Sequence, residues 1–334
     1  MNMMMKPPQL SLSDLLEQVS QRGGINLKQD IASISQHLPQ LPANWHRNGD
    51  DAAAIPLGPR GEHGYQLLAI EGMQGELVRK QPWFAGWCSV MVNCSDIAAM
   101  GGRPTAVVDA LWCDAHQPEH EQWLSELMRG MRDASSHLGV PIVGGHTNLR
   151  SMHANLAVSI MGHAKRLLSA FAAKPGQKIV AAIDHRGQFQ HGSLNWNAAT
   201  SAPAERLRGD MELLPLIAEQ QLADACKDIS QAGLLGTCIM LLESSGCGAE
   251  VLLEQLPVPT QVELSDWLCA FPSFGYLLTT DAERLPQLLA TFSERDICAT
   301  VIGHMTDSQT LEVSWRGQQQ CFYNLKDTSL TGFT

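Results

Sequence analysis

The chain has 334 residues, of which 44% are hydrophobic and 17% are charged, and its formal net charge is −11. This apolar content excludes a disordered chain, and the length favours two domains over one, because a single core usually stops growing at a smaller size. The acidic balance and the absence of a Lys/Arg cluster argue against nucleic-acid binding. No apolar run has the roughly 18 residues needed to span a bilayer, and residues 1–10 lack the apolar core of a signal peptide, so we expect a cytoplasmic protein without membrane partners.

The first half alternates between helical and extended patterns, which predicts an α+β or mixed α/β domain over residues 1–164. The expected elements are a helix over 12–19, a strand over 65–70, a helix over 83–100, a strand over 105–112, a helix over 119–138 and strands over 140–143 and 155–161. The Lys174-Pro175-Gly176 break near the end of this region is typical of a joint between domains.

The second half, residues 165–334, shows the same alternation and predicts a second domain. The expected elements are a strand over 178–183, helices over 211–222 and 234–244, strands over 250–253 and 275–279, a helix over 285–293 and strands over 299–302 and 311–315. Residues 187–201 are rich in Gln and Asn and have no clear period, so this stretch is predicted to be a loop.

Two adjacent carboxylates, Asp50 and Asp51, follow a glycine and precede three alanines. Adjacent carboxylates repel each other and are best tolerated in a loop that exposes them to water or to a hard cation. The pattern therefore fits a cation site, and it equally fits a solvated turn that enters a strand.

A further carboxylate, Asp96, lies in an apolar helical segment that ends at Gly101-Gly102 and Pro104. A carboxylate in such a setting is costly unless it is paired or binds a metal. The alternative is that Asp96 lies on the solvent-facing side of its helix, beside Asn93.

The segment Gly144-Gly145-His146-Thr147 follows a β-branched run, which predicts a glycine turn. Paired glycines let the backbone approach a ligand closely, and the amides of such a turn can bind an anion. An ordinary turn fits the same pattern.

Asp228 lies in a predicted turn that opens a helix, with Ser230 two residues later. Asp228 is a candidate ligand, although a carboxylate here also favours the helix dipole and Ser230 also fits a helix cap.

Together and in this order, the four motifs resemble the AIR-synthase-like (PurM-like) superfamily, which includes thiamine-monophosphate kinase and selenophosphate synthetase. The resemblance covers roughly residues 45–305. Its most specific part is the Asn-x-Ser-Asp-Ile-Ala-Ala-Met-Gly-x-x-Pro element at 93–104, and Gly-Asp-Asp-Ala-Ala at 49–53 is also similar.

The resemblance implies a two-domain fold in which the N-terminal domains of a homodimer form a shared β-barrel and the C-terminal domain is an α/β sandwich. It also implies that ATP and Mg²⁺ bind in an acidic cleft. The metal ligands that it implies are Asp50, Asp51, Glu71, Asp96 and Asp228. The nucleotide contacts that it implies are Asp50, Asp51, Asn93, Asp96, Gly144, Gly145, His146, Thr147 and Asp228.

Some residues depart from the family pattern. Thiamine-monophosphate kinases have aspartate where this chain has His146, and relatives have aspartate where it has Glu71. The stretch 188–201 lacks the glycine-rich turn of those kinases, so we assign it to the site of a different acceptor.

Two functions follow from the resemblance. The first is a magnesium-dependent kinase or synthetase that transfers phosphate from ATP to an oxygen of a small molecule, with thiamine-monophosphate kinase as the runner-up specific enzyme. The second is a regulatory or scaffold protein that kept nucleotide binding and lost catalysis, which the replaced aspartates at 71 and 146 favour.

Overall fold

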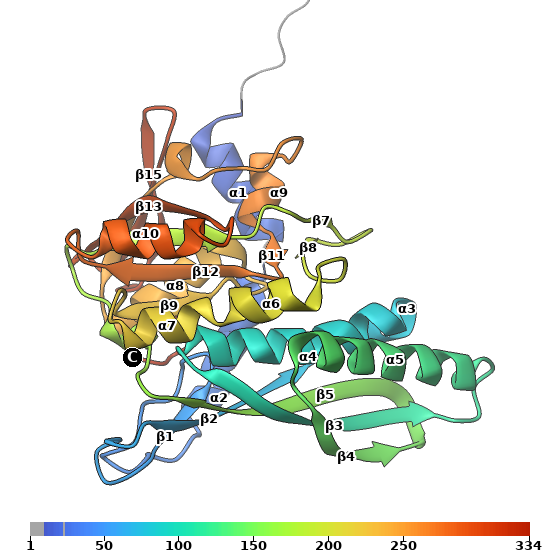
Figure 1. Cartoon of the computed structure of the whole chain (residues 1–334). Helices are drawn as coiled ribbons and strands as arrows, with labels where there is room; N and C mark the ends of the chain where they lie inside the picture. Colours follow the sequence, from blue (N-terminus) through green and yellow to red (C-terminus); the bar gives the residue numbers. More distant parts are fainter. Residues whose placement is uncertain (1–9, 23) are drawn as a thin grey trace, which may run out of the picture.

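The first unit of the computed structural model, which describes residues 10–22 and 24–334, is built on a five-stranded sheet (Figure 1). The strand order is β1-β2-β5-β3-β4, and only the β3–β4 pair is parallel among the pairs of this sheet in the described residues. The strands are β1 (Ala53–Pro56), β2 (Tyr65–Gly72), β3 (Arg103–Asp114), β4 (Ile142–Asn148) and β5 (Arg150–Ala164). Three helices cover one face: α3 (Gly75–Lys80), α4 (Pro82–Ala99) and α5 (His120–Leu138).

Two glycines let α4 and α5 pack closely. A Cβ atom on Gly86 would lie 2.1 Å from the carbonyl oxygen of Leu127, and one on Gly130 would lie 1.9 Å from that of Trp83. Any side chain at either position would push the helices apart. Helix α5 ends at Gly139, whose φ of +73° is the left-handed conformation that favours glycine at this position.

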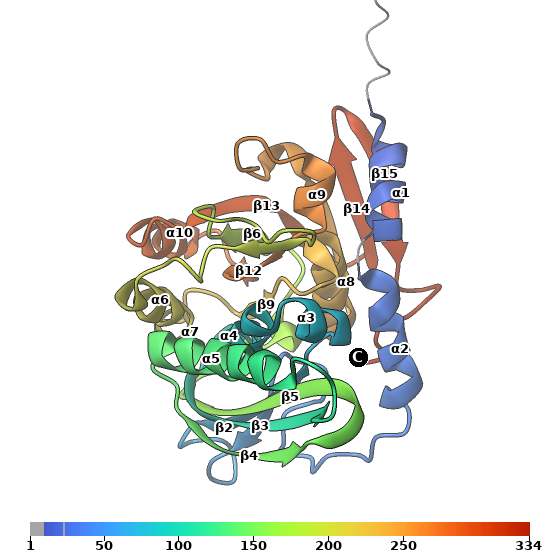
Figure 2. The same ribbon diagram turned by 90° about the vertical axis from the view of Figure 1, so that its right-hand side faces the viewer.

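The second unit has a seven-stranded sheet of order β15-β14-β10-β13-β6-β12-β9, with helices on both faces (Figure 2). The strands are β6 (Lys178–Ile183), β9 (Ala225–Asp228), β10 (Gly248–Leu252), β12 (Gly275–Thr280), β13 (Cys298–Thr306), β14 (Thr310–Trp315) and β15 (Gln318–Asn324). The helices are α6 (Ala204–Met211), α7 (Leu213–Glu219), α8 (Gly233–Ser245), α9 (Leu264–Leu268) and α10 (Leu285–Ser293), with short 3₁₀ turns at Ala170–Ala172 and Leu253–Gln255.

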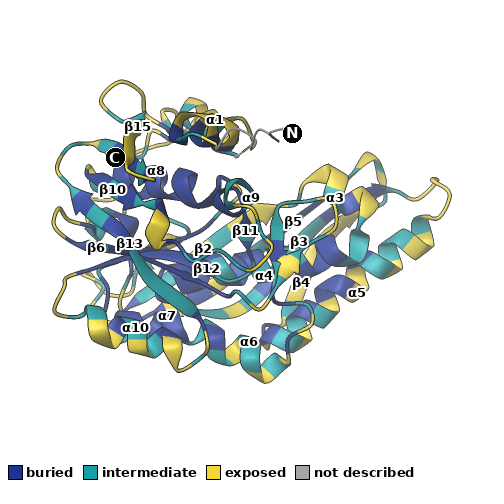
Figure 3. Ribbon diagram, turned by 90° about the horizontal axis from the view of Figure 1, so that it is seen from above, coloured by how far each residue is buried: buried dark blue, intermediate teal, exposed yellow. Residues whose placement is uncertain are grey.

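Strand β6 shows why this unit is a sandwich. Ile179 and Ala181 belong to the core that includes α8, whereas Val180 and Ala182 belong to the core that includes α7 and α10. A strand buried on both faces is expected to be apolar, as β6 is from Ile179 to Ile183. The buried residues are concentrated in such central strands and in α4 and α8 (Figure 3).

The predicted loop over 187–201 is wrong in part, because it contains two strands of a small third sheet. The sheet has the order β11-β8-β7, with β7 (Gln188–Phe189), β8 (Asn195–Asn197) and β11 (Phe271–Pro272). Strands of two or three residues are too short to show an alternating pattern in the sequence.

The predicted glycine turn at 144–147 is also wrong, because these residues continue strand β4. Gly144 and Gly145 pair with Val108 and Asp109 of β3. A Cβ atom on Gly145 would lie 2.9 Å from the backbone carbonyl oxygen of Asp109, so the close approach of the neighbouring strand favours glycine here.

Helices α1 (Leu12–Arg22) and α2 (Ile25–Ser35) come first in the chain, yet α1 packs on the second unit. It lies beside β15 and α9 (Figure 2), and its buried residues share one core with α8. Among the described residues, no helix has the length and apolar character required to cross a membrane.

Candidate functional site

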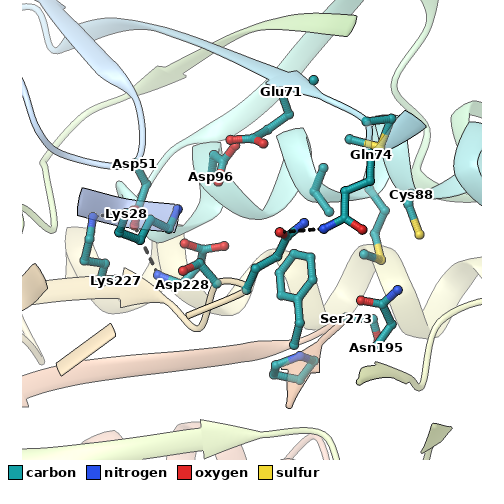
Figure 4. A pocket seen from close by; sticks show the side chains of 18 of the residues that line it. Lys28, Asp51, Glu71, Gln74, Cys88, Asp96, Asn195, Lys227, Asp228 and Ser273 are labelled. Atoms are coloured by element: carbon teal, nitrogen blue, oxygen red, sulfur yellow. Dashed lines mark hydrogen bonds and ion pairs between the residues drawn. The ribbon is translucent and has the colours of Figure 1, made fainter. Parts of the chain in front are cut away.

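A cavity of about 290 Å³ lies between the two units (Figure 4). Its walls come from α2, the loop before β1, the end of β2, α3 and α4 on one side. On the other side they come from β8, β11, the β9–α8 loop and the C-terminal segment. The cavity thus brings together segments that are far apart in the sequence.

Four carboxylates form the acidic side of this cavity. Asp51 precedes β1, Glu71 lies near the end of β2, Asp96 lies near the end of α4 and Asp228 ends β9. Figure 4 shows Glu71 and Asp96 close together, with Asp228 and Asp51 beside them. Sequence reasoning named all four, and the fold places them in one cavity.

Asp96 is the most constrained of the four carboxylates. Its residue is 7% exposed, and its Oδ2 atom is buried without a hydrogen-bond partner in the described residues. Burial, and then the charges of Asp228 and Glu71, raise the pKa of Asp96 well above its usual value. A bound cation would offset the free-energy cost of ionising Asp96 at this position.

Asp51 is held by two neighbours on β9. Lys227 Nζ donates to Asp51 Oδ1 at 2.5 Å, and the backbone N–H of Asp228 donates to Asp51 Oδ2 at 3.1 Å. Burial raises the pKa of Asp51 although the charge of Lys227 opposes the shift. Burial lowers the pKa of Lys227, but the charge of Asp51 raises it. The net result is a raised pKa for Lys227. These bonds connect the first unit to the second.

The remaining two carboxylates also resist ionisation. Burial, and then the charge of Asp51, raise the pKa of Asp228 to about 8. The surroundings of Glu71 raise its pKa through desolvation, while the charge of Lys28 acts in the opposite direction. Lys28 lies on α2 and points toward this group of carboxylates (Figure 4).

Asp50, predicted as a metal ligand, has its oxygens occupied by protein donors. Oδ2 accepts from Ser169 Oγ at 2.6 Å and lies 2.7 Å from His46 Nε2, and Oδ1 accepts from the backbone N–H of Ala170 at 2.9 Å. The side chain is fully buried. These contacts fix the loop that presents Asp51, and Asp50 also lines the cavity, so its role as a metal ligand stays a prediction.

Five other predicted contacts lie away from the cavity lining. Asn93 is fully buried in α4, where its Nδ2 donates to Ser89 O at 2.8 Å. Residues 144–147 lie on β4 at the edge of the first sheet and are exposed. None of these five residues lines the cavity, and their nucleotide contacts stay predictions.

Several lining residues were not identified from the sequence. Lys28 and Lys227 give no motif signal, because a single lysine in a helix or at a strand end is common. Gln74, which directly precedes α3, donates to Gln231 of the β9–α8 loop at 2.9 Å across the two units. Asn195 also lines the cavity, and it lies in the polar stretch 188–201 that we assign from the sequence to an acceptor site.

Thr331 and Phe333 of the C-terminal segment also line the cavity. The Glu243 carboxylate on α8 anchors this segment by accepting from the backbone N–H groups of Leu330, Thr331 and Gly332. No sequence pattern indicated this contact.

Comparison with known proteins agrees with the fold. The AIR synthase related protein N-terminal domain matches residues 49–165, and the corresponding C-terminal domain matches residues 175–316. The chain is also 41% identical, over 97% of its length and 99% of the other's, to the uncharacterized protein sll0787 of Synechocystis sp.. The chain belongs to the AIR synthase related family.

Solved structures of this PurM-like superfamily share the two-unit architecture. T. maritima PurL complexed with ATP has a TM-score of 0.69 at 19% identity, covering 92% of this chain and 50% of that one. AaThiL complexed with AMPPCP and TMP has a TM-score of 0.64 at 16% identity, covering 96% of this chain and all of that one. The AIR synthase related chain therefore spans about half of the PurL chain, and at these identities the likeness shows the fold alone.

Proposed function

We propose that this AIR synthase related protein is a magnesium-dependent enzyme that transfers phosphate from ATP to an oxygen of a small molecule in the cytoplasm. The acidic side of the cavity is the proposed position of the triphosphate. The solved relatives that contain ATP or AMPPCP support nucleotide binding by this fold. The observation that carries the proposal is the buried, unpartnered Oδ2 of Asp96 among three further carboxylates.

The carboxylates fit magnesium in one particular way. The described residues contain no cluster of three or more His, Cys, Asp or Glu side chains arranged to hold a metal ion. Magnesium is usually held by one or two carboxylates, with waters and substrate phosphates completing the shell, so such a cluster is not required. Asp96 and Asp228 are the proposed ligands, with Glu71 next to them and Asp51 already paired with Lys227.

Bound magnesium would supply charge neutralisation to the triphosphate. The chain's own groups would orient the reactants. The acceptor oxygen forms a bond to the γ-phosphorus, the bond from that phosphorus to the β–γ bridging oxygen breaks, and ADP leaves with the electron pair. The proton lost from the acceptor passes to water or to a carboxylate of the cavity. Lys227 and Lys28 are placed to attract the phosphates into this side of the cavity.

The experiment is a calorimetric titration with AMPPCP, with and without Mg²⁺, on the wild type and on Asp51→Asn and Asp96→Asn. We expect magnesium-dependent binding that both substitutions weaken. A steady release of ADP from ATP with a metabolite pool then tests turnover. Unchanged ATP turnover in both variants would contradict the proposal.

A second candidate is a nucleotide-binding protein without catalysis. The ion pair between Lys227 and Asp51 favours it, because the lysine already neutralises one expected ligand. This candidate predicts AMPPCP binding with no ADP release above background in the presence of any metabolite pool.

We also propose that the chain forms a homodimer through the open face of the first sheet. This face, opposite α4 and α5, exposes large apolar side chains on four adjacent strands: Leu68, Ile70, Val108, Val143 and Met161. An apolar face of this kind marks an interaction site. Sedimentation equilibrium would show a dimer in the wild type and a monomer in Ile70→Asp if the proposal holds.

A further inference from the structure

The cavity has a second side that differs in chemistry from the acidic one. Gln74, Asn195 and Ser273 lie beyond the carboxylates (Figure 4), and Gln231 is bonded to Gln74; we call these four residues the amide side. Aromatic side chains, including Phe84 and Phe271, line the same cavity. The amide side is therefore polar, hydrogen-bonding and bordered by apolar surface.

The charges of the cavity are confined to the acidic side. Among the described lining residues, the basic side chains are Lys28 and Lys227. Lys227 is bonded to Asp51, and Figure 4 shows Lys28 beside it. No charged side chain of the described lining belongs to the amide side, so an anionic ligand placed there would find no counter-charge.

Two groups on the amide side have hydrogen-bonding capacity to spare. The side chain of Asn195 makes no hydrogen bond within the described part of the chain. The backbone carbonyl oxygen of Asn195 accepts from the backbone N–H of Gln190 at 2.8 Å and holds β8 in place. Ser273 Oγ accepts from Ala198 N at 3.0 Å, which leaves its proton free to be donated. Gln74 and Gln231 share one hydrogen bond across the two units, in which Gln74 Nε2 donates to Gln231 Oε1 at 2.9 Å.

We infer that the acceptor is an uncharged small molecule that carries a carboxamide-like donor and acceptor group beside an apolar part. Asn195 and Ser273 bind this group, and the aromatic side chains contact the apolar part. Placing a carboxylate or a phosphate on the amide side would remove its water without supplying a cation. This inference rests on the proposed function, since it assigns the acidic side to the nucleotide.

The first test compares amides with carboxylates of the same shape. Saturation-transfer NMR on the protein loaded with AMPPCP and Mg²⁺ measures binding of nicotinamide against nicotinate and of isobutyramide against isobutyrate. We expect each amide to bind at least about tenfold more tightly than its carboxylate. Carboxylates that bind as tightly as the amides, or amides that do not bind at all, would overturn the inference.

The second test changes the charge of the amide side. We expect Asn195→Lys to reverse the preference in favour of nicotinate and isobutyrate, and Asn195→Ala to weaken amide binding without that reversal. The matched control is Asn155→Lys, because Asn155 is exposed and lies outside the cavity lining. A preference that Asn195→Lys and Asn195→Ala leave unchanged would place probe binding elsewhere and overturn the inference.

The same samples separate this inference from the proposed function. If AMPPCP does not bind but the amide preference of the nucleotide-free protein depends on Asn195, the proposed function fails and the uncharged subsite stands. If AMPPCP binds and the amide preference is absent, the subsite fails alone.

Discussion

Lys227 Nζ lies 2.5 Å from Asp51 Oδ1, and both side chains are almost completely removed from solvent, with exposures of 5% and 6%. The pair joins the loop before β1 in the first unit to the end of β9 in the second unit. A buried ion pair adds little to the free energy of unfolding compared with an apolar pair of the same shape. Removing one partner, however, leaves the other charge buried and unpaired. The pair therefore makes the contact between the units depend on both residues.

Lys227→Met should destabilise the protein strongly. The substitution leaves Asp51 buried without its cation, and breaking such a pair costs about 3–5 kcal/mol. Urea denaturation measures the free energy of unfolding. The control is Lys80→Met, because Lys80 forms an exposed pair with Glu76 and should change stability little. Equal stability of Lys227→Met and the wild type would show that the contact between the units does not depend on this pair.

Asp96→Asn should separate stability from activity. It removes a charge that burial and its neighbours disfavour, so the thermal unfolding midpoint of the ligand-free protein should stay constant or rise. Loss of an electrostatic contact to the reacting phosphate should lower ADP release by roughly 10²-fold or more. Calorimetry and a coupled ADP assay on the same preparation provide both values. A large fall in the midpoint would mean that Asp96 has a structural role.

Most of the acidic side could be predicted from local sequence signals, whereas Glu71 was named only from the family resemblance. Asp96 interrupts an apolar helix, and Asp51 follows another aspartate in a glycine turn. Such placements are costly without a ligand, and this cost is visible in the sequence alone. The sequence does not show that the oxygens of Asp50 accept hydrogen bonds from Ser169 and Ala170.

The other side of the cavity depends on contacts that the sequence does not show. Asn195 lies in a three-residue strand, and its neighbour Ser273 follows a two-residue strand. Helix α1 joins the core of the second unit although it is first in the chain, because its apolar face finds its partners there. The elements of β2, α4, α5 and α8 were predicted with bounds close to those in the structure, since long periodic patterns are determined locally.

The contribution of Asp228 to the stability of the ligand-free protein should fall as the pH rises from about 4 toward about 8. The pKa of Asp228 lies at about 8 in the folded protein against 3.8 for the free side chain. The folded state then binds more protons than the unfolded state within this window, so the free energy of unfolding decreases with pH. Asp228→Asn should flatten this dependence in thermal scans between pH 5 and pH 8.

Magnesium should reverse the loss of stability at high pH. A cation binds the ionised carboxylates, so the increase of the unfolding midpoint with Mg²⁺ should be larger at pH 8 than at pH 6. Ca²⁺ at the same concentration tests whether the site distinguishes the two ions. A shift that does not depend on pH would indicate that magnesium binds away from Asp96 and Asp228.

Glu243→Ala should release the C-terminal segment and weaken nucleotide binding. Glu243 is 3% exposed and accepts from three backbone N–H groups and from the Thr331 hydroxyl. Losing these charge-assisted bonds should cost about 2–3 kcal/mol of the free energy of unfolding. Because Thr331 and Phe333 line the cavity, the affinity for AMPPCP should fall as well.

The release can be followed by hydrogen exchange of residues 330–333, which should become fast in Glu243→Ala. Glu243→Gln is the matched control, because an amide keeps one oxygen acceptor and should retain part of the protection. Phe333→Ala removes a cavity wall but leaves the anchor at Glu243, so it should weaken AMPPCP binding without accelerating exchange at Leu330. If Glu243→Ala accelerates exchange and leaves AMPPCP affinity unchanged, the segment stabilises the fold but takes no part in the site.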